Sequence, residues 1–248
     1  MMKKQLTIII IHWNTPDLLK QQLKVLTAKK DFQVIVVDNN SDFSINDLEE
    51  KYKQVKFILN EKNHGFAYAC NQGLKIAETK WLLFLNPDVA ISIDQAEEMI
   101  KYAEKKNLVA LSPSFKSDDY QKPIPSVFSL LAEFTPLKYL VPLSIFKHKT
   151  LVGGCLMIKK QALNKVDGWD TDFFLWFEDS DLSKRLIKDD YKIGFYPEAI
   201  SHLGGEALKK LEEEEQRKIF FTSMQTYAKK HFSLFGQLIV KLLKKRYT

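Results

Sequence analysis

Glu178, Asp179 and Asp181 stand close together at the end of an aromatic run, FFLWF, that covers residues 173–177. A carboxylate beside apolar walls is partly desolvated, and desolvation makes it a stronger proton acceptor. Acids in the first turn of a helix are also favoured by the helix dipole, so helix capping explains the same residues equally well. The segment therefore predicts either a general base or an ordinary helix start.

A further acid, Asp88, follows the apolar run 81–85 through Asn86 and Pro87. Proline restricts the residue before it to extended geometry, which would hold Asn86 and Asp88 at a fixed spacing. A carboxylate there could bind Mg²⁺ or Mn²⁺, which take oxygen ligands and neutralise a departing diphosphate. Asn-Pro-Asp is also a common turn, so the pattern alone is a weak indication of a metal site.

Two more polar residues come at the ends of apolar runs. Asp38 follows 34–37 and could accept hydrogen bonds from a ribose or a base edge, although Asp is also a frequent turn residue. His202 could be a metal ligand, but a lone histidine in a loop is more often only a polar residue. Each of the two therefore keeps a structural explanation beside the functional one.

The elements that must position these residues alternate along the first half of the chain. The spacing of apolar residues and the positions of turn-forming residues predict strands at 6–12, 33–37, 55–59, 81–85 and 109–111. They predict helices at 16–27, 45–52, 67–77 and 92–105. This succession predicts the α/β class, with a mostly parallel central sheet flanked by helices, as in Rossmann-like folds. Ligands of such sheets bind beyond the carboxyl ends of the strands, where Asp38 and Asp88 stand.

The second half is less regular. It predicts strands at 150–158 and 192–196 and helices at 178–188, 206–230 and 232–246. The sequence contains no internal repeat and no low-complexity linker. We therefore expect one main domain, residues 1–205, and a C-terminal helical extension, residues 206–248.

Composition narrows the class of protein. The chain has 248 residues, of which 45% are hydrophobic and 27% charged, as in ordinary globular domains. Its two cysteines, Cys70 and Cys155, have no metal-ligand spacing and indicate a reducing compartment. The apolar run 6–11 is too short for a signal peptide, and no run approaches the roughly 20 residues of a membrane span. We expect a cytoplasmic protein.

Several nucleotide motifs are missing from the sequence. No G-x-G-x-x-G follows the first strand, and neither a P-loop nor a G-x-S-x-G elbow occurs. These absences disfavour a dinucleotide enzyme and an α/β-hydrolase. The net charge of +6 comes without any nucleic-acid-binding motif, so we expect no nucleic-acid partner.

Taken in order, the segments resemble family 2 glycosyltransferases of the GT-A fold, in particular the rhamnosyltransferase-like bacterial branch. The resemblance runs over nearly all of residues 6–205. It is carried by segments 8–14, 36–41, 63–67, 71–73, 85–88, 153–158, 168–170, 173–185 and 202–205.

The resemblance implies a role for each of these sites. Asp179 would be the general base, supported by Glu178 or Asp181, and the choice among the three acids stays open. Asp88 would bind Mg²⁺ or Mn²⁺ at the diphosphate, and His202 would complete that site. The donor would be held by Asn14, Asp38, Asn40, Asn63, Gly65, Asn71, Asn86, Gly153 and Gly154.

The implied reaction is inverting transfer of a sugar from a nucleotide diphosphate to an acceptor hydroxyl, in the assembly of cell-surface polysaccharide or another glycan. The branch suggests dTDP-rhamnose as donor, with a UDP-sugar second. The D-x-D motif of the fold stands here as Asn86-Pro87-Asp88, which leaves one strong metal ligand.

Two rival functions belong to other classes. A sugar-1-phosphate nucleotidyltransferase would carry a glycine-rich, arginine-bearing loop after the first strand, and none is present. A non-catalytic nucleotide-sugar-binding protein would have lost its base, whereas Asp88 and Asp179 are both retained.

The last predicted helix, 232–246, has apolar residues at helical spacing with lysines between them. This pattern is typical of a helix that lies on an anionic membrane surface. A helix packed on the domain or on a homodimer partner fits equally well. Peripheral attachment to the inner face of the cell membrane would suit a lipid-linked acceptor.

Overall fold

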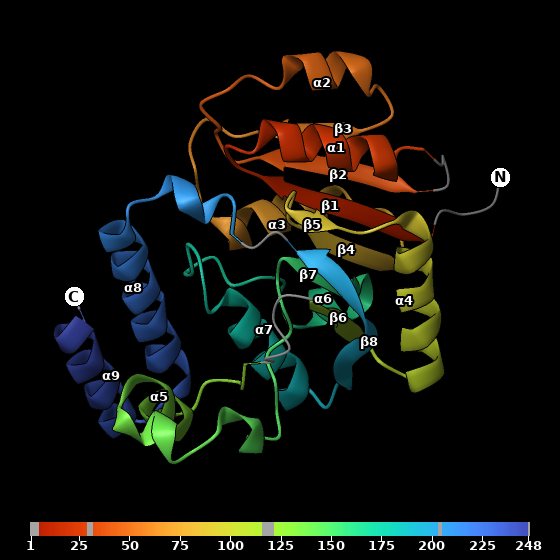
Figure 1. Cartoon of the computed structure of the whole chain (residues 1–248). Helices are drawn as coiled ribbons and strands as arrows, with labels where there is room; N and C mark the ends of the chain where they lie inside the picture. Colours follow the sequence, from red (N-terminus) through yellow and green to blue (C-terminus); the bar gives the residue numbers. More distant parts are fainter. Residues whose placement is uncertain (1–4, 29–31, 116–121, 203–204, 248) are drawn as a thin grey trace.

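The computed structural model describes residues 5–28, 32–115, 122–202 and 205–247 (Figure 1). Its core is a sheet of eight strands in the order β3-β2-β1-β4-β7-β6-β8-β5. The strands are β1 Leu6–His12, β2 Gln33–Asp38, β3 Lys56–Leu59, β4 Trp81–Leu85, β5 Val89–Ala90, β6 Ala110–Phe115, β7 Cys155–Lys159 and β8 Ile193–His202.

The first half of the sheet is parallel, as its alternating strands and helices predict. Strand β1 pairs in parallel with both β2 and β4, and β2 with β3. The second half is mixed: β6 and β8 are parallel, but β7 runs antiparallel to β4 and β6, and β5 to β8. The sheet thus has more antiparallel pairing than we predicted, because the residues of β7 specify a strand but not the direction in which it joins β4 and β6.

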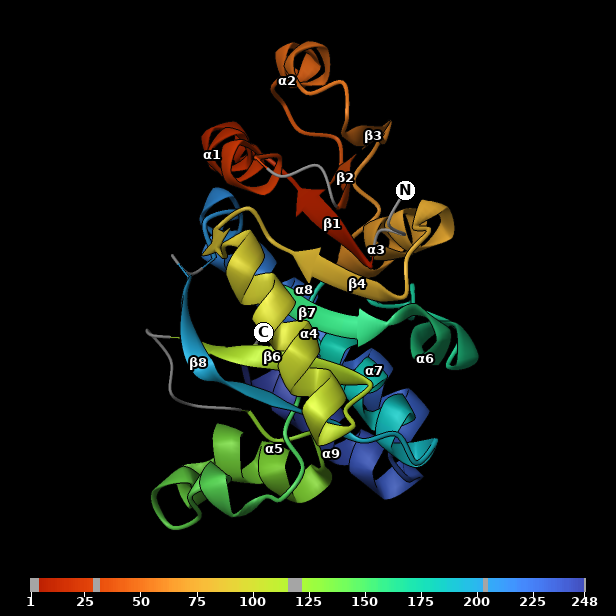
Figure 2. The ribbon, with the colours of Figure 1, turned by 90° about the vertical axis from the view of Figure 1, so that its right-hand side faces the viewer.

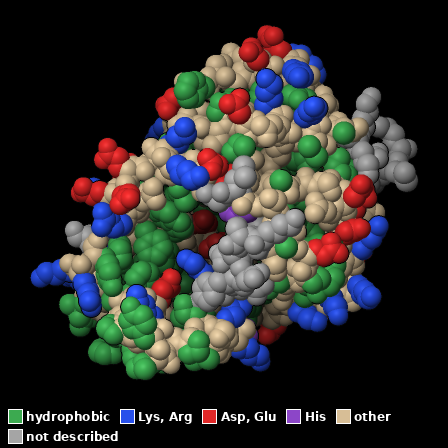
Figure 3. Space-filling view, viewed as in Figure 1, with side chains coloured by type: hydrophobic (Ala, Val, Ile, Leu, Met, Phe, Trp, Pro, Cys, Tyr) green, Lys and Arg blue, Asp and Glu red, His purple; other side chains and the backbone are tan. Residues whose placement is uncertain are grey.

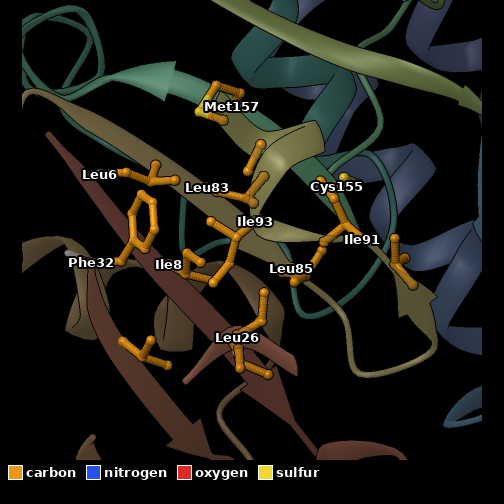
Figure 4. Close-up of a cluster of buried hydrophobic side chains, with 14 of the residues drawn as sticks. Leu6, Ile8, Leu26, Phe32, Leu83, Leu85, Ile91, Ile93, Cys155 and Met157 are labelled. Atoms are coloured by element: carbon orange, nitrogen blue, oxygen red, sulfur yellow. The ribbon is translucent and has the colours of Figure 1, made fainter. Parts of the chain in front are cut away.

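Helices cover both faces of the sheet (Figure 2). The helices α1 Pro16–Leu26, α2 Asn46–Lys51 and α4 Ile93–Lys106 lie on one face, and α3 Phe66–Ile76, α6 Lys160–Lys165 and α7 Glu178–Lys188 on the other. Alternate residues of β1 point to opposite faces, so Ile8 and Ile10 join the first cluster (Figure 4), and Ile9 and Ile11 the second. Burial on both faces explains why this strand reads as a continuous apolar run.

The sequence also specifies where a helix begins. Ser92 Oγ accepts a hydrogen bond from the Gln95 backbone N–H at 3.2 Å, and Gln95 Oε1 accepts one from the Ser92 N–H at 2.9 Å. This reciprocal capping box confirms the predicted start of α4.

A third layer lies beside the sheet. It contains α5 Val127–Phe134, the 3₁₀ turns Pro136–Tyr139, Leu143–Ile145 and Leu208–Lys210, α8 Glu213–His231 and α9 Leu234–Tyr247. The helix that we predicted at 206–230 begins only at Glu213, after a 3₁₀ turn. Helices α8 and α9 pack on α5 and on the 173–177 segment around a third apolar cluster. Within the described part of the chain, no helix is both long and apolar enough to cross a membrane.

Candidate functional site

A cavity of about 480 Å³ opens at the carboxyl ends of β1, β2 and β4. Antiparallel β7 begins at this edge, and the Asn86 N–H donates to the Gly154 carbonyl at 2.9 Å. The space-filling view shows acidic side chains and a histidine deep in a hollow (Figure 3). Of the residues predicted to act, the lining contains Asn63, Gly65, Asn86, Asp88, Gly153, Gly154, Glu178, Asp179 and His202.

The pairing of β5 with β8 brings Asp88 and His202 together, because Val89 lies opposite His202. Asp88 Oδ2 lies 3.4 Å from His202 Nε2 and accepts a hydrogen bond from the Glu206 N–H at 3.2 Å. Burial by itself would raise the pKa of Asp88, but these contacts outweigh it and hold the pKa below its ordinary value. Asp88 is therefore a buried, ionised carboxylate.

Asp88 and His202 fit a divalent cation that is shared with a substrate. Asp88 Oδ1 is buried and has no hydrogen-bond partner among the described residues, so one oxygen is left for a ligand. No cluster of three or more His, Cys, Asp or Glu side chains that could hold an ion occurs in the ranges that the structure describes. Mg²⁺ is commonly bound by one or two protein ligands together with substrate phosphates, and two donors match that pattern.

The aromatic run brings Glu178 and Asp179 to the wall of the same cavity. Trp176 and Phe177 both have left-handed backbone, with φ of 66° and 69°, and this turn starts α7. Asp179 accepts hydrogen bonds from the backbone N–H of Ser180 at 2.7 Å and of Gly153 at 3.4 Å. Strained backbone at such a point is typical of a functional site.

The two acids differ in their electrostatics. Burial, and then the neighbouring charge of Asp179, raise the pKa of Glu178 well above its ordinary value. Burial also raises the pKa of Asp179, while the N–H groups of Gly153 and Ser180 favour its charged form. Of the two, Asp179 is therefore the acid whose charged form the site favours.

Asp181 has a structural role. Its carboxylate is 1% exposed and contacts Arg185 Nε and Nη2, both at 2.7 Å, and His231 Nε2 at 2.7 Å. Burial by itself would raise the pKa of Asp181, but the His231 and Arg185 contacts outweigh it and lower the pKa. Asp181 is also not among the residues that line the cavity, so the choice of base narrows to Glu178 and Asp179.

Glycines let the backbone approach closely on two sides of the cavity. At Gly65, with φ of 89°, a Cβ would lie 2.4 Å from the Phe174 carbonyl oxygen. At Gly154 it would lie 2.8 Å from Asn86 Nδ2. Asn63 Oδ1 completes the first turn by accepting from the Gly65 N–H at 2.9 Å. A side chain at either position would need the contacting atoms to shift, and the donor contacts implied for Gly65 and Gly154 stay predictions.

Four predicted donor residues do not line the cavity. Asn71 pairs with the backbone of Trp169 through both amide atoms, at 2.7 and 3.0 Å, and so fixes a turn elsewhere. Asn40 is exposed, with φ of 62°. The amide group of Asn14 is paired with Asp42 at 2.8 and 2.7 Å.

Asp38, the fourth of these residues, is buried and bonded within the protein. Its Oδ1 lies 2.6 Å from both His12 Nδ1 and Ser41 Oγ, and Oδ2 accepts from the Ser41 N–H at 3.1 Å. Burial by itself would raise the pKa of Asp38, but these bonds lower it. Asp38 thus orders the loops that follow β1 and β2, and the nucleoside contact that the resemblance implies for it stays a prediction.

Other residues of the site were not predicted. Asn39 lines the cavity and donates to Asn63 Oδ1 at 2.7 Å, and its place beside Asp38 was the available signal. Trp13 also lines the cavity, and its place beside Asn14 was the available signal. No sequence pattern indicated Leu208, Leu211 or Glu215, which reach the cavity from the third layer.

A second cavity, of about 420 Å³, adjoins the first. Four residues line both: Val152, Trp176, Asp179 and His202. Its other walls are mainly aromatic and aliphatic, with Lys122 and Glu133 at one side. Asp179 therefore stands between two adjoining cavities.

Comparison with known proteins agrees with the class predicted from the sequence, the glycosyltransferases. The solved structure of the mannosyltransferase PcManGT from Pyrobaculum calidifontis, in complex with GDP-Man and Mn²⁺, superposes with a TM-score of 0.60 at 14% identity. The match covers 96% of this chain and 79% of that one. At this identity the likeness concerns the fold, which is that of the GT-A glycosyltransferases, as predicted.

Family models identify the chain within that class. The model described as "Glycosyl transferase family 2" matches residues 7–167, and one described as "N-terminal domain of galactosyltransferase" matches residues 144–204. Because the first covers more than half of the chain, this protein belongs to glycosyl transferase family 2. The predicted family is thus confirmed.

Two curated relatives show the range of the family. Poly-beta-1,6-N-acetyl-D-glucosamine synthase of Staphylococcus epidermidis is 27% identical over 194 residues, which are 74% of this chain and 45% of the synthase. Rhamnosyltransferase WbbL of Escherichia coli K12 is 26% identical over 211 residues, which are 77% of this chain and 80% of WbbL. The chain thus spans less than half of the first relative and most of the second.

Proposed function

We propose that this chain is an inverting glycosyltransferase that moves a sugar from a nucleotide diphosphate donor to an acceptor hydroxyl. The observation that carries the proposal is the position of Asp179 between two adjoining cavities. One cavity holds the candidate metal ligands and suits the donor. The other, with aromatic walls, suits the acceptor.

In the donor cavity, Asp88 and His202 would hold Mg²⁺ or Mn²⁺ at the diphosphate. When bound, the cation stabilises the negative charge of the departing nucleotide. The buried, unpartnered Oδ1 of Asp88 supports this role. Asn63 and Asn86 offer amide groups to the rest of the donor, and Asn39, whose amide is bonded within the protein, positions Asn63.

In the reaction, Asp179 accepts the proton of the acceptor hydroxyl while the hydroxyl oxygen attacks the anomeric carbon. The bond from that carbon to the diphosphate oxygen breaks, and the nucleotide leaves with the electron pair. Attack from the face opposite the diphosphate inverts the anomeric configuration. Protonated Glu178 supports Asp179 by keeping a second negative charge out of the site.

The identities of the donor and the acceptor are also part of the proposal. dTDP-rhamnose is the first donor to test, in line with the similarity to a rhamnosyltransferase, and a UDP-sugar is the second. The acceptor would be a glycan or a lipid-linked sugar in cell-surface polysaccharide assembly, on the cytoplasmic side of the membrane. A homodimer is compatible with this role.

A screen of nucleotide sugars by thermal shift, with and without Mn²⁺, followed by turnover assays, tests the proposal. We expect one nucleotide sugar to raise the melting temperature in the presence of Mn²⁺ and to be consumed with release of nucleoside diphosphate. Release of pyrophosphate from a nucleoside triphosphate and a sugar 1-phosphate would instead identify a nucleotidyltransferase. Binding without turnover of any donor, with a range of glycan acceptors, would identify a binding protein.

A further inference from the structure

Exposed apolar side chains are concentrated on one part of the molecule. Of the fourteen large hydrophobic side chains exposed in the described ranges, nine come from 128–145 and 234–247. Both views place α5, the 3₁₀ turns after it and α9 at the lower end of the molecule (Figures 1 and 2). Hydrophobic side chains gather at the lower left of the space-filling view (Figure 3). We call these two segments the α5–α9 face.

Helix α9 is apolar on two sides. Its inner side, with Gly236, Val240 and Leu243, is buried against the third cluster. Its outer side exposes Leu234, Phe235, Leu238 and Leu242, with Leu234 at 83% and Phe235 at 72%. An amphipathic helix of a monomer needs only the inner side, so the outer apolar row is not explained by packing.

The second half of the face comes from a distant part of the sequence. Tyr139, Leu140 and Ile145 are exposed in and beside the 3₁₀ turns that follow α5, with Leu140 at 77%. The Tyr247 hydroxyl donates to the Phe134 carbonyl at 2.7 Å, which fixes the end of α9 on the end of α5. The two apolar segments are thus held together by the fold.

The charge of the residues around this face indicates what kind of partner it binds. Residues 128–149 contain three lysines and one acid, Glu133, and residues 232–248 contain three lysines, one arginine and no acid. A second copy would bring like charges together, whereas an anionic lipid surface attracts them. Lysine stems can lie along apolar surface while their ammonium groups stay at the headgroups. We propose that the α5–α9 face docks on an anionic bilayer surface, with its apolar side chains in the interface.

One of these elements, α5, also lines the second cavity. Leu130 and Glu133 of α5 and Phe220 of α8 belong to its walls. A bilayer on the α5–α9 face would therefore lie near the cavity that suits the acceptor, and a lipid-linked acceptor could reach Asp179 from the membrane. This last step rests on the proposed function, whereas vesicle binding requires no turnover, so the two can fail separately.

Sedimentation of the full chain with vesicles tests the proposal. The vesicles are phosphatidylcholine alone, or phosphatidylcholine mixed with phosphatidylglycerol, at low and high salt. Two double variants change the two apolar segments of the face separately. One combines Phe235→Glu with Leu238→Glu in α9, and the other combines Leu140→Glu with Ile145→Glu in the segment after α5. The matched control, Val25→Glu with Phe43→Glu, adds the same charge at side chains that are 48% and 62% exposed outside the face.

We expect the wild type and the control to bind the anionic vesicles, with weaker binding at high salt and on phosphatidylcholine alone. Each face variant should lower the partition coefficient by about tenfold or more, with an unchanged circular dichroism spectrum. A wild type that stays in the supernatant, or face variants that sediment like the control, would overturn the proposal. So would a dimer in analytical ultracentrifugation that both face variants dissociate, since the face would then bind a second copy.

Discussion

At the first turn of α7, three nearby carboxylates have two different environments. Asp181 is bonded to Arg185 and His231, and its pKa is lowered, whereas Glu178 and Asp179 face the cavity with raised pKa values. The sequence indicated an acidic cluster but not these two environments. Asp181 differs from the other two acids partly through its contact with His231, which comes from α8, far along the chain. The residue types indicated that one of these acids could be a general base. Tertiary contacts determine which of them face the cavity.

The Glu178→Gln substitution should stabilise the protein. A carboxyl whose pKa is higher in the folded state costs stability as the pH rises above its unfolded value of about 4.3. The variant should match the wild type near pH 4 and exceed it at pH 8 by at least about 1 kcal/mol. Thermal unfolding at both pH values measures this, with about 2–4 °C expected per kcal/mol. A variant that is less stable at pH 8 would mean that the Glu178 carboxylate is charged and paired in the fold.

Gly65→Ala should destabilise the turn that precedes α3. The new Cβ would lie 2.4 Å from a backbone oxygen, at a φ of 89° that L-residues rarely adopt. We expect a loss of more than about 2 kcal/mol in the free energy of unfolding by urea. Gly153→Ala is the comparison, since its Cβ would meet no atom closer than 3.3 Å, and it should cost clearly less. Equal losses in the two variants would contradict the predicted clash.

At the scale of elements, the sequence predicted best where local signals were strong. The bounds of α7 agree with the prediction, and the Ser92 cap fixes the start of α4. Strand β7 was expected from its residues, but not its antiparallel direction, since direction depends on which strands it joins. The contact of Asn71 with Trp169 could not be predicted for a similar reason, because the two residues lie far apart in the sequence. The start of α8 was placed too early, as acidic residues alone do not separate a helix from a 3₁₀ turn.

The contact of Asp181 with Arg185 and His231 joins α7 to α8. We expect Asp181→Asn to lower the free energy of unfolding by about 3 kcal/mol at pH 7, because it breaks a buried ion pair. Since the pKa of Asp181 is lowered in the fold, this stability is present above about pH 4 and is lost as the pH falls further. The difference between variant and wild type should therefore shrink towards pH 3.

A matched control separates this effect from a general loss of charge. Asp172 is also ion-paired, with Lys230 at 2.6 Å, but its side chain is 67% exposed. Asp172→Asn should change the free energy of unfolding by less than about 1 kcal/mol. If it cost as much as Asp181→Asn, burial would not be the source of the stability.

At the scale of the molecule, the site is assembled from three layers. The sheet brings Asp88 and His202 together, α7 carries the acids, and the third layer contributes Leu208, Leu211 and Glu215 to the cavity wall. The first two parts could be predicted from polar residues at the ends of strands and helices. The third could not, because residues 206–248 carry no pattern that separates cavity lining from a surface helix.

The proposed metal dependence is a property of the whole sheet, since the two proposed ligands come from distant segments, Asp88 just before β5 and His202 at the end of β8. Asp88→Asn should weaken the binding of the nucleotide sugar in the presence of Mn²⁺ by about tenfold or more, as measured by calorimetry. Without Mn²⁺ the variant and the wild type should bind alike. Asp47→Asn, in the first turn of α2 and exposed, is the control and should bind as the wild type does. Wild-type binding by Asp88→Asn in Mn²⁺ would place the metal elsewhere.

The central claim is that Asp179 takes the acceptor proton between the two cavities. Sugar transfer by the wild type and by Asp179→Asn, at saturating donor, tests it most directly, with donor affinity measured on the same samples. We expect the variant to bind the donor normally and to transfer sugar about 10²–10⁴-fold more slowly. The wild-type rate should rise with pH through a midpoint above about 3.9, the ordinary pKa of aspartate, because burial raises the pKa of Asp179. Transfer by Asp179→Asn at the wild-type rate would contradict it.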